Sequence, residues 1–162
     1  MQGGILTYAL LGALATGLLI AAFTDLRRRE IDNWLTAAIA LAAPLFWISS
    51  GLPLGSVGMQ LAIALATFIV LVGLFALNLM GGGDVKLLTA LSLWIAPLWY
   101  LKLIIVMALV GGVLTLVCGA IHLVRRQQGK VAVPYGIAIS AAGLWVLASQ
   151  HFTALRSGGF FG

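Results

Sequence analysis

The sequence predicts an all-α integral membrane protein, a bundle of six transmembrane helices with both termini outside. Of its 162 residues, 62% are hydrophobic and only 8% are charged, and the mean hydropathy is +1.15. Soluble domains carry about 25% charged residues, so this chain has too few charges to cover a surface that faces water. The single cysteine, Cys118, excludes an intrachain disulfide and a paired-cysteine zinc site.

The excess of basic residues indicates orientation in a membrane and not nucleic-acid binding. The chain has nine Lys and Arg residues against four acids, and its pI is near 10. In membrane proteins, short loops rich in Lys and Arg stay on the cytoplasmic side. We therefore expect membrane lipid around the bundle and no nucleic-acid partner.

The spans follow from apolar runs, since a helix needs about 20 mostly apolar residues to cross a bilayer. Five segments read as spans and cover residues 4–23, 34–48, 57–79, 99–124 and 134–148. The first lacks the basic start of a cleaved signal peptide, so we interpret it as retained. No linker, repeat or low-complexity tract interrupts the chain, so residues 1–162 are expected to form a single polytopic domain.

A sixth span, fourth in chain order, is short: residues 85–97 would cover only about 20 Å as a helix. Charge placement decides whether it crosses. Residues 25–33 hold three arginines, and a second basic loop follows residue 124. Four segments, the second to the fifth, lie between these two loops, and both loops are on the same side of the membrane only if all four cross it. The short segment is therefore expected to cross, at a place where the bilayer is locally thinner. Cytoplasmic loops then carry seven of the nine basic residues, namely Arg27, Arg28, Arg29, Lys86, Arg125, Arg126 and Lys130.

Aromatic residues lie near the ends of these segments. Trp34, Trp47, Trp94, Trp99 and Tyr100 all have such positions. Tryptophan and tyrosine are enriched where a membrane meets water. We therefore expect these side chains at the interface.

The four acids of the chain fall into two classes. The topology puts Asp25 and Asp84 at the cytoplasmic face, each beside an apolar span, whereas Glu30 and Asp32 sit among arginines in a polar loop. Ionisable residues at membrane depth are costly and therefore indicate function. Two simpler interpretations remain: a salt bridge from Asp25 to the neighbouring arginines, and helix N-capping by Asp84.

Two carboxylates that lie close together can divide the work of peptide hydrolysis. Ionising both carries a high free-energy cost because the two negative charges repel each other, so one group keeps its proton and the other does not. The ionised group takes a proton from water, and the protonated group polarises the scissile carbonyl and later protonates the leaving amine. This is aspartic-protease chemistry, and it requires no metal or cofactor.

A run of three glycines, from Gly81 to Gly83, comes directly before Asp84. Glycine adopts positive φ and lets another backbone approach closely. An extended substrate strand could therefore lie beside the second acid. Helix termination is the simpler interpretation of the same run.

Three motifs in order resemble the type IV prepilin peptidases, which are polytopic aspartic proteases of the GxGD kind. The first has the form D-x5-I-D-N and runs from Asp25 to Asn33. The second is the GxGD motif, Gly81-Gly82-Gly83-Asp84, continued by Val85 and Lys86. The third is Val133-Pro134-Tyr135-Gly136, at the start of the last span.

The resemblance implies a role for each motif residue. Asp25 and Asp84 would be the catalytic pair, and Gly81 and Gly83 would shape the loop. Lys86 would orient a carboxylate or a substrate carbonyl, its alternative being a lysine that snorkels to the interface. The remaining loop-shaping or substrate-binding candidates are Asn33, Pro134, Tyr135 and Gly136.

The resemblance also implies a reaction and a location. The substrate would be a pilin-like precursor protein, cleaved after a short basic leader and just before its hydrophobic helix. The enzyme would be a multi-pass protein of the bacterial cytoplasmic (inner) membrane, without metal or cofactor. The oligomeric state does not follow from the motifs.

One departure from the family pattern narrows the expected activity. Larger members carry a cytoplasmic insertion with paired cysteines and also methylate the new N-terminus. Here the corresponding loop, residues 25–33, is short and has no cysteine. Methyl transfer is therefore not expected, and the compact form resembles the Tad/Flp-pilus branch.

A rival function belongs to a different class of protein. The two acids could bind a proton or a cation in a small transporter or a membrane assembly subunit. Carriers usually place such acids near the middle of the bilayer, whereas Asp25 and Asp84 lie at span ends. The sequence therefore favours the protease.

Overall fold

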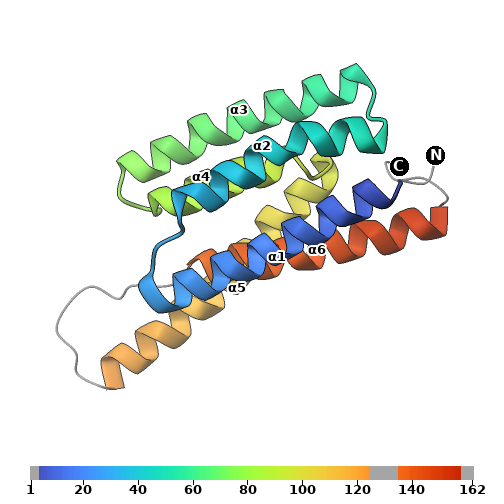
Figure 1. Ribbon diagram of the computed structural model, residues 1–162. Coiled ribbons are helices and arrows are strands. Elements are labelled where there is room, and N and C mark those ends of the chain that lie inside the picture. The colour runs from blue at the N-terminus through green and yellow to red at the C-terminus, as the bar shows by residue number, and fades with distance from the viewer. Residues whose placement is uncertain (1–3, 125–134, 158–162) are drawn as a thin grey trace.

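The computed structural model describes residues 4–124 and 135–157, with side chains placed for residues 4–121 and 135–150. These residues form six α-helices and no strand (Figure 1). The helices are α1 (Ile5–Arg28), α2 (Asn33–Ser50), α3 (Leu54–Ala76), α4 (Gly82–Ser92), α5 (Pro97–Val124) and α6 (Tyr135–Ser157). The prediction of an all-helical protein is confirmed for this part of the chain.

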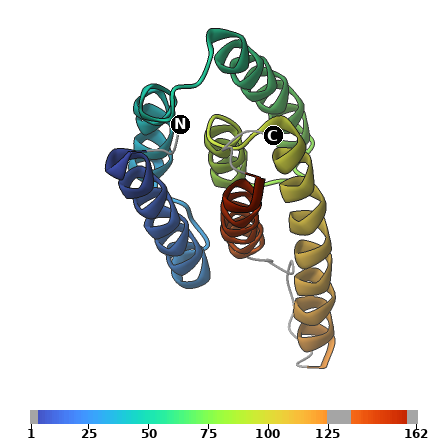
Figure 2. The same cartoon turned by 90° about the vertical axis from the view of Figure 1, so that its right-hand side faces the viewer.

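Helix α4 lies at the centre of the bundle. It packs against α2, α3 and α6, while α6 also packs against both α1 and α5 (Figure 2). Helices α2 and α3 follow one another in the chain but make little contact with each other, because each packs on α4 instead. The shortest helix therefore holds the longer ones together.

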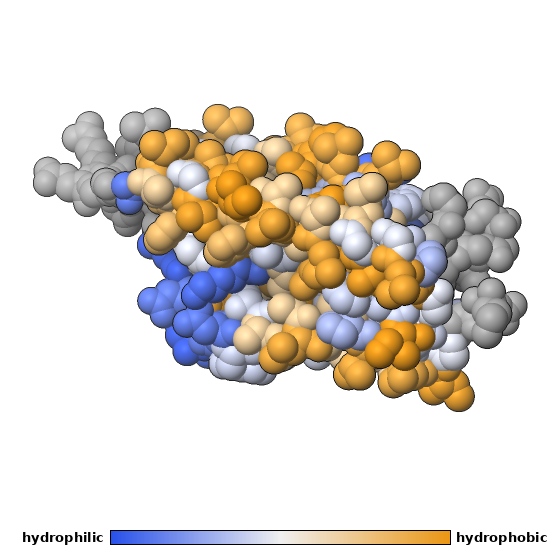
Figure 3. Space-filling view, turned by 90° about the horizontal axis from the view of Figure 1, so that it is seen from above, coloured by the Kyte–Doolittle hydropathy of each residue, from blue (hydrophilic) through white to orange (hydrophobic). Residues whose placement is uncertain are grey.

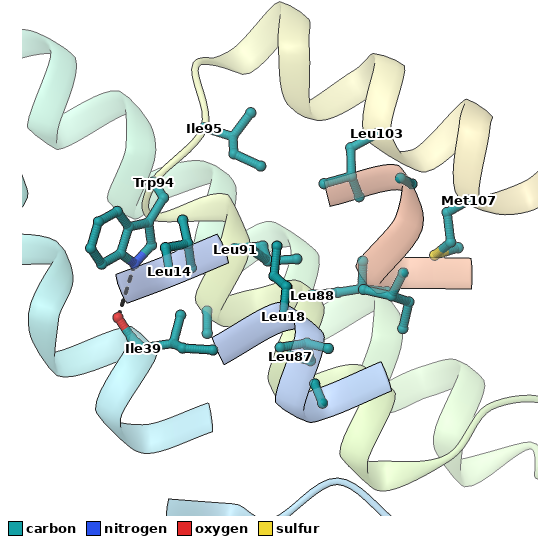
Figure 4. Packing of buried hydrophobic residues seen from close by; sticks show 14 of the residues in the cluster. Leu14, Leu18, Ile39, Leu87, Leu88, Leu91, Trp94, Ile95, Leu103 and Met107 are labelled. Carbon is teal, nitrogen blue, oxygen red and sulfur yellow. Dashed lines mark hydrogen bonds between the residues drawn. The ribbon is translucent and has the colours of Figure 1, made fainter. Parts of the chain in front are cut away.

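The core explains why α4 is central. Leu87, Leu88 and Leu91 are fully buried on α4 and belong to one apolar cluster with Leu18 of α1 and Leu103 of α5 (Figure 4). A helix with buried side chains on most of its circumference must be covered by neighbours. The buried part of α4 thus fixes where its first turn, with Asp84, must lie.

Two of the aromatic residues expected at the interface are core residues instead. Trp94 is 2% exposed, stacks on Phe46, and donates a hydrogen bond from its indole N–H to the carbonyl of Ile39 at 2.9 Å. Tyr100 is also buried, and its hydroxyl donates to the carbonyl of Leu88. Interfacial placement is wrong for these two because backbone carbonyls inside the bundle satisfy their polar groups.

One helix boundary differs from the expected one in a way that affects the acids. Residues 25–28 were expected in a polar loop, but they form the last turn of α1. Arg29 closes the helix in the left-handed conformation, φ 55°, and its N–H donates to the carbonyl of Asp25 at 2.8 Å. Arg27 and Arg28 favour this extension, since cations stabilise a helix C-terminus.

Four of the described helices are long and apolar enough to cross a membrane. They are Ile5–Arg28, Asn33–Ser50, Leu54–Ala76 and the Pro97–Ile121 part of α5. Large apolar side chains cover the outer surface, and on the face seen in Figure 3 hydrophobic residues predominate away from one polar end. The chain is therefore a multi-pass membrane protein. Helix α4, with 11 residues, is only about 16 Å long.

Candidate active site

A cavity of about 660 Å³ opens at the end of the bundle where the α1–α2 and α3–α4 connections lie. Its walls come from residues 25, 29–31 and 33, from residues 78–84, and from Tyr135 at the start of α6. On the face shown in Figure 3, hydrophilic residues gather at this end. All three motifs of the sequence therefore contribute to one cavity.

Asp25 reaches this cavity from the last turn of α1 and is only 5% exposed. Its carboxylate lies against the first turn of α6, where the backbone N–H groups of Gly136 and Ile137 stabilise its negative charge. The positive charge of Arg29 acts in the same direction. The Oδ2 atom of Asp25 is buried and has no hydrogen-bond partner among the described residues, so this oxygen is an available acceptor.

Asp84 reaches the same cavity from the first turn of α4 and is 8% exposed. The N-cap of this helix is Gly81, so N-capping by Asp84 itself is wrong. Asp84 is the third helical residue, and its side chain interacts with the backbone N–H of Gly81. This is the reciprocal half of a capping box, in which an acid three residues into the helix reaches back to the N-cap.

The two acids interact with each other, because the charge of Asp25 acts on the Asp84 carboxyl group. They are also the only two of the chain's four acids that are buried. Two buried carboxyl groups in mutual range are costly to ionise together. The arrangement therefore suits a pair that holds one proton between them.

The other two acids lie outside this pair, but only one of them lies outside the cavity. Asp32 forms the exposed ion pair expected of it, with its Oδ2 atom 3.1 Å from Arg28. Glu30 is exposed but also lines the cavity. The exposure of Glu30 agrees with the solvated role expected of an acid in this loop, and its side chain also adds a third carboxylate to the cavity lining.

The glycines at positions 81 and 83 allow neighbouring atoms to approach the backbone closely, and neither of them has a positive φ. A Cβ atom on Gly83 would lie 3.1 Å from the Cβ of Ile31, so this glycine lets the first turn of α4 pack on the α1–α2 connection. A Cβ on Gly81 would lie 3.0 Å from the Oδ2 of Asp84. The positive φ expected in this run is found instead at Asn78, φ 57°.

The third motif is anchored by α5. The ring of Tyr135 lies against Gly111, where a Cβ would come within 2.9 Å of Cε1. Its hydroxyl is hydrogen-bonded to the Thr115 hydroxyl at 3.2 Å. The next residue, Gly136, faces Asp25 so closely that a Cβ there would lie 2.8 Å from both Cγ and Oδ2. Helix α5 thus holds Tyr135 at the cavity wall, and α6 presents its N-terminus to Asp25.

Lys86 contacts a different partner from the carboxylates that it was expected to orient. Its Nζ donates a hydrogen bond to the Oδ1 of Asn33 at 2.7 Å, and it does not line the 660 Å³ cavity. Asn33, by contrast, does line it. The pair joins the start of α2 to α4 at the edge of the site.

Some candidates lie outside the described residues. Pro134 is one of them, as are the basic residues Arg125, Arg126 and Lys130. The structural account of the third motif therefore begins at Tyr135.

Several cavity residues were missed by sequence reasoning, and two of them are the polar residues Arg29 and Asn78. Arg29 was expected to set the topology and either to contact anionic lipid or to guide an acidic part of the substrate, and Asn78 was not considered; both line the cavity. Both adopt the left-handed conformation, which is uncommon for residues other than glycine. Their positions in the sequence could have indicated them, since Arg29 lies within the first motif and Asn78 lies three residues before Gly81.

The part of the chain that the structure describes contains no group of three or more His, Cys, Asp or Glu side chains that could hold a metal ion. In comparison with known protein families, the model of the type IV leader peptidase family matches residues 12–120. This range includes both buried acids. No curated protein and no solved structure matches the chain significantly.

Proposed function

The chain belongs to the type IV leader peptidase family and is therefore a peptidase, and we propose that it is an aspartic endopeptidase with Asp25 and Asp84 as its catalytic pair. Its substrate is a pilin-like precursor, cut after a short basic leader. The observation that carries the proposal is that the only two buried acids of the chain line one cavity and interact there.

The reaction follows from one proton held between two carboxyl groups. The ionised carboxylate takes a proton from a water molecule, whose oxygen attacks the scissile carbonyl carbon. The protonated carboxyl group gives its proton to the carbonyl oxygen as the tetrahedral intermediate forms. The intermediate then collapses and the C–N bond breaks, as the carboxyl group that took the proton from water passes it to the leaving amine nitrogen. The other carboxylate takes back the proton from the hydroxyl that becomes the carbonyl of the new acid, so the pair again holds one proton.

Burial opposes ionisation of both acids, but Asp25 has more groups around it that stabilise a negative charge than Asp84 has, so Asp25 is the carboxylate that starts ionised. The N-terminus of α6 and the charge of Arg29 both stabilise its negative form. Asp84 then carries the proton and polarises the substrate carbonyl. This division matches the different surroundings of two acids that otherwise share one cavity.

Orientation follows from the basic residues. The cavity and the Arg27–Arg29 run lie at the same end of α1, and short basic loops stay cytoplasmic. The proposal has six crossings in a bacterial inner membrane, with the short segment after Asp84 as the fourth. The scissile bond is then cut at the cytoplasmic face.

The proposed activity is restricted to cleavage. The connection between α1 and α2 consists of residues 29–32 and has no cysteine, so it leaves no room for an inserted domain. Methyl transfer is therefore not part of the proposal. The compact form supports a place in the Tad/Flp-pilus branch.

The test is co-expression with small pilin precursors that carry a basic leader, followed by N-terminal sequencing of the product. Asp25→Asn and Asp84→Asn are each expected to lower cleavage by at least about a thousandfold, because each removes a proton acceptor or donor. Asp32→Asn is the matched control, since its carboxylate only pairs with Arg28 at the surface. Full cleavage by either of the first two variants refutes the catalytic pair. Proton- or cation-coupled transport without any cleavage supports the rival carrier function.

A further inference from the structure

A second hollow in the bundle is an apolar groove of about 360 Å³ between α2, α3 and α4. Positions 33, 36, 37 and 40 of α2 form one wall. Positions 86, 89 and 90 of α4 form the other, together with the C-cap residue at position 93. Both sets have the spacing of one helix face over two turns, about 10 Å. Phe68 of α3 completes the lining.

The architecture explains why this groove exists. Helices α2 and α3 both pack on α4 but barely touch each other, so α4 is exposed to the side between them. Several of the lining side chains are small, among them Ala37, Ala40 and Ala90, and they leave space along the groove. Small residues on a membrane helix let another helix approach closely.

The groove offers little to a polar ligand along most of its length. The hydroxyl of Thr36 donates to the carbonyl of Asn33 in its own helix, and that of Thr89 donates to the carbonyl of Val85 at 2.8 Å. Polar groups that can still reach a ligand are confined to one end, where Lys86 is hydrogen-bonded to Asn33. An apolar segment with a polar end therefore fits the groove.

That polar end is continuous with the candidate active site. Asn33 lines both the 660 Å³ cavity and the groove. A chain that leaves the cavity past Asn33 enters the groove and runs along α2 and α4 toward the middle of the bundle. The opening between α2 and α3 gives that chain a sideways route from the lipid.

We propose that this groove binds the apolar segment of the precursor that follows the scissile bond, with the Lys86–Asn33 pair marking the passage to the catalytic acids. The proposal rests on the proposed function and adds the site that selects the substrate. The segment docks as a helix whose face fits between α2 and α4, the usual way in which an apolar helix occupies a groove. The leader stays on the polar side, in the cavity.

The first experiment uses a photoreactive amino acid, p-benzoylphenylalanine, at residue 37 or at residue 38. Ala37 lines the groove, whereas Ala38 is also exposed on α2 but does not line it. Each variant also carries Asp84→Asn, which keeps the precursor uncleaved, and is reconstituted with a small pilin precursor in bacterial phospholipid vesicles. Crosslinks to the apolar segment are expected from residue 37 and not from residue 38. Equal yields, or crosslinks from residue 37 to lipid or to a second copy of the chain, overturn the proposal.

The second experiment measures cleavage by Ala37→Trp and Ala38→Trp in an otherwise unaltered chain. Filling the groove is expected to slow cleavage at limiting precursor about tenfold, as a changed apolar contact in a binding site does, and Ala38→Trp is expected to match the unaltered protein. Equal cleavage rates for the two variants refute binding of the precursor in the groove and leave the proposed peptidase activity unaffected. Absence of cleavage by the unaltered protein with every precursor refutes the proposed function itself, so the two failures are distinguishable.

Discussion

The surroundings of Asp25 and Asp84 differ in where their stabilisation comes from. Asp84 lies in the first turn of its own helix, where backbone N–H groups favour a carboxylate, and it interacts with Gly81 three residues earlier. Asp25 lies in the last turn of its own helix, where carbonyl groups disfavour a carboxylate. The backbone N–H groups at the N-terminus of α6, which is far away in the sequence, stabilise the Asp25 carboxylate instead. One acid is placed by local sequence and the other by a tertiary contact.

Among the glycine substitutions, the largest effect is expected from Gly136→Ala, which breaks that tertiary contact. The new Cβ would lie 2.8–2.9 Å from Cβ, Cγ and Oδ2 of Asp25, so rotating the carboxylate does not relieve the clash. Cleavage is expected to fall by about a hundredfold, the cost of a misplaced catalytic group. The rate of precursor cleavage in vesicles is the measurement. Gly12→Ala in α1 is the control, because a Cβ there meets nothing within 4 Å; equal rates for the two variants contradict the contact.

An intermediate effect is expected from Gly111→Ala in α5. The added Cβ would come within 2.9 Å of the Tyr135 ring, which must move from the cavity wall and disturb the start of α6. A loss of about tenfold is expected, less than for a direct clash with a catalytic acid. The neighbouring Gly112→Ala is the matched control, since a Cβ there is in open space. A comparison of kcat/KM for the two variants tests the claim, and identical values would exclude a positioning role for Gly111.

The smallest effect is expected from Gly81→Ala, beside the locally placed acid. Its Cβ would meet only the outer end of the Asp84 side chain, with Oδ2 at 3.0 Å and Cγ at 3.7 Å. A flexible side-chain end can shift by a few tenths of an ångström, so a loss of only about threefold is expected. Activity should therefore follow the order Gly81→Ala, Gly111→Ala, Gly136→Ala, from least to most impaired. A Gly81→Ala variant as inactive as Gly136→Ala contradicts the difference between the two acids.

Much of the site could be predicted because the chain has so few charges. With only four acids, topology alone separated Asp25 and Asp84 from Glu30 and Asp32, and the three motifs marked the segments that meet at the cavity. The glycines before Asp84 indicated a close approach by a substrate strand, which stays a prediction; the close approach in the structure is between Gly83 and another part of the same chain. The partner, Ile31, did not follow from the pattern, because spacing in the sequence does not say which loop packs on which.

Other features depend on packing between distant segments. Trp94 has the sequence position of an interfacial residue, but the carbonyl of Ile39 provides its hydrogen bond inside the bundle. Lys86 comes two residues after Asp84, about half a helical turn, so its side chain leaves the helix on another side and contacts Asn33 at the edge of the site. In both cases a contact between helices decided the role of a residue whose local sequence favoured another.

The sequence by itself determined that this protein lies in a membrane, that it is helical, and which two acids face a common side, because hydropathy and charge act along the chain. Only the tertiary structure decided that α4 is the central helix, that α6 presents its N-terminus to Asp25, and that α2 and α3 leave a groove between them. These features depend on which helices pack together. Packing is set by side-chain volume across helices, as at Gly111 and Gly136, and such complementarity is visible only once both surfaces are in place.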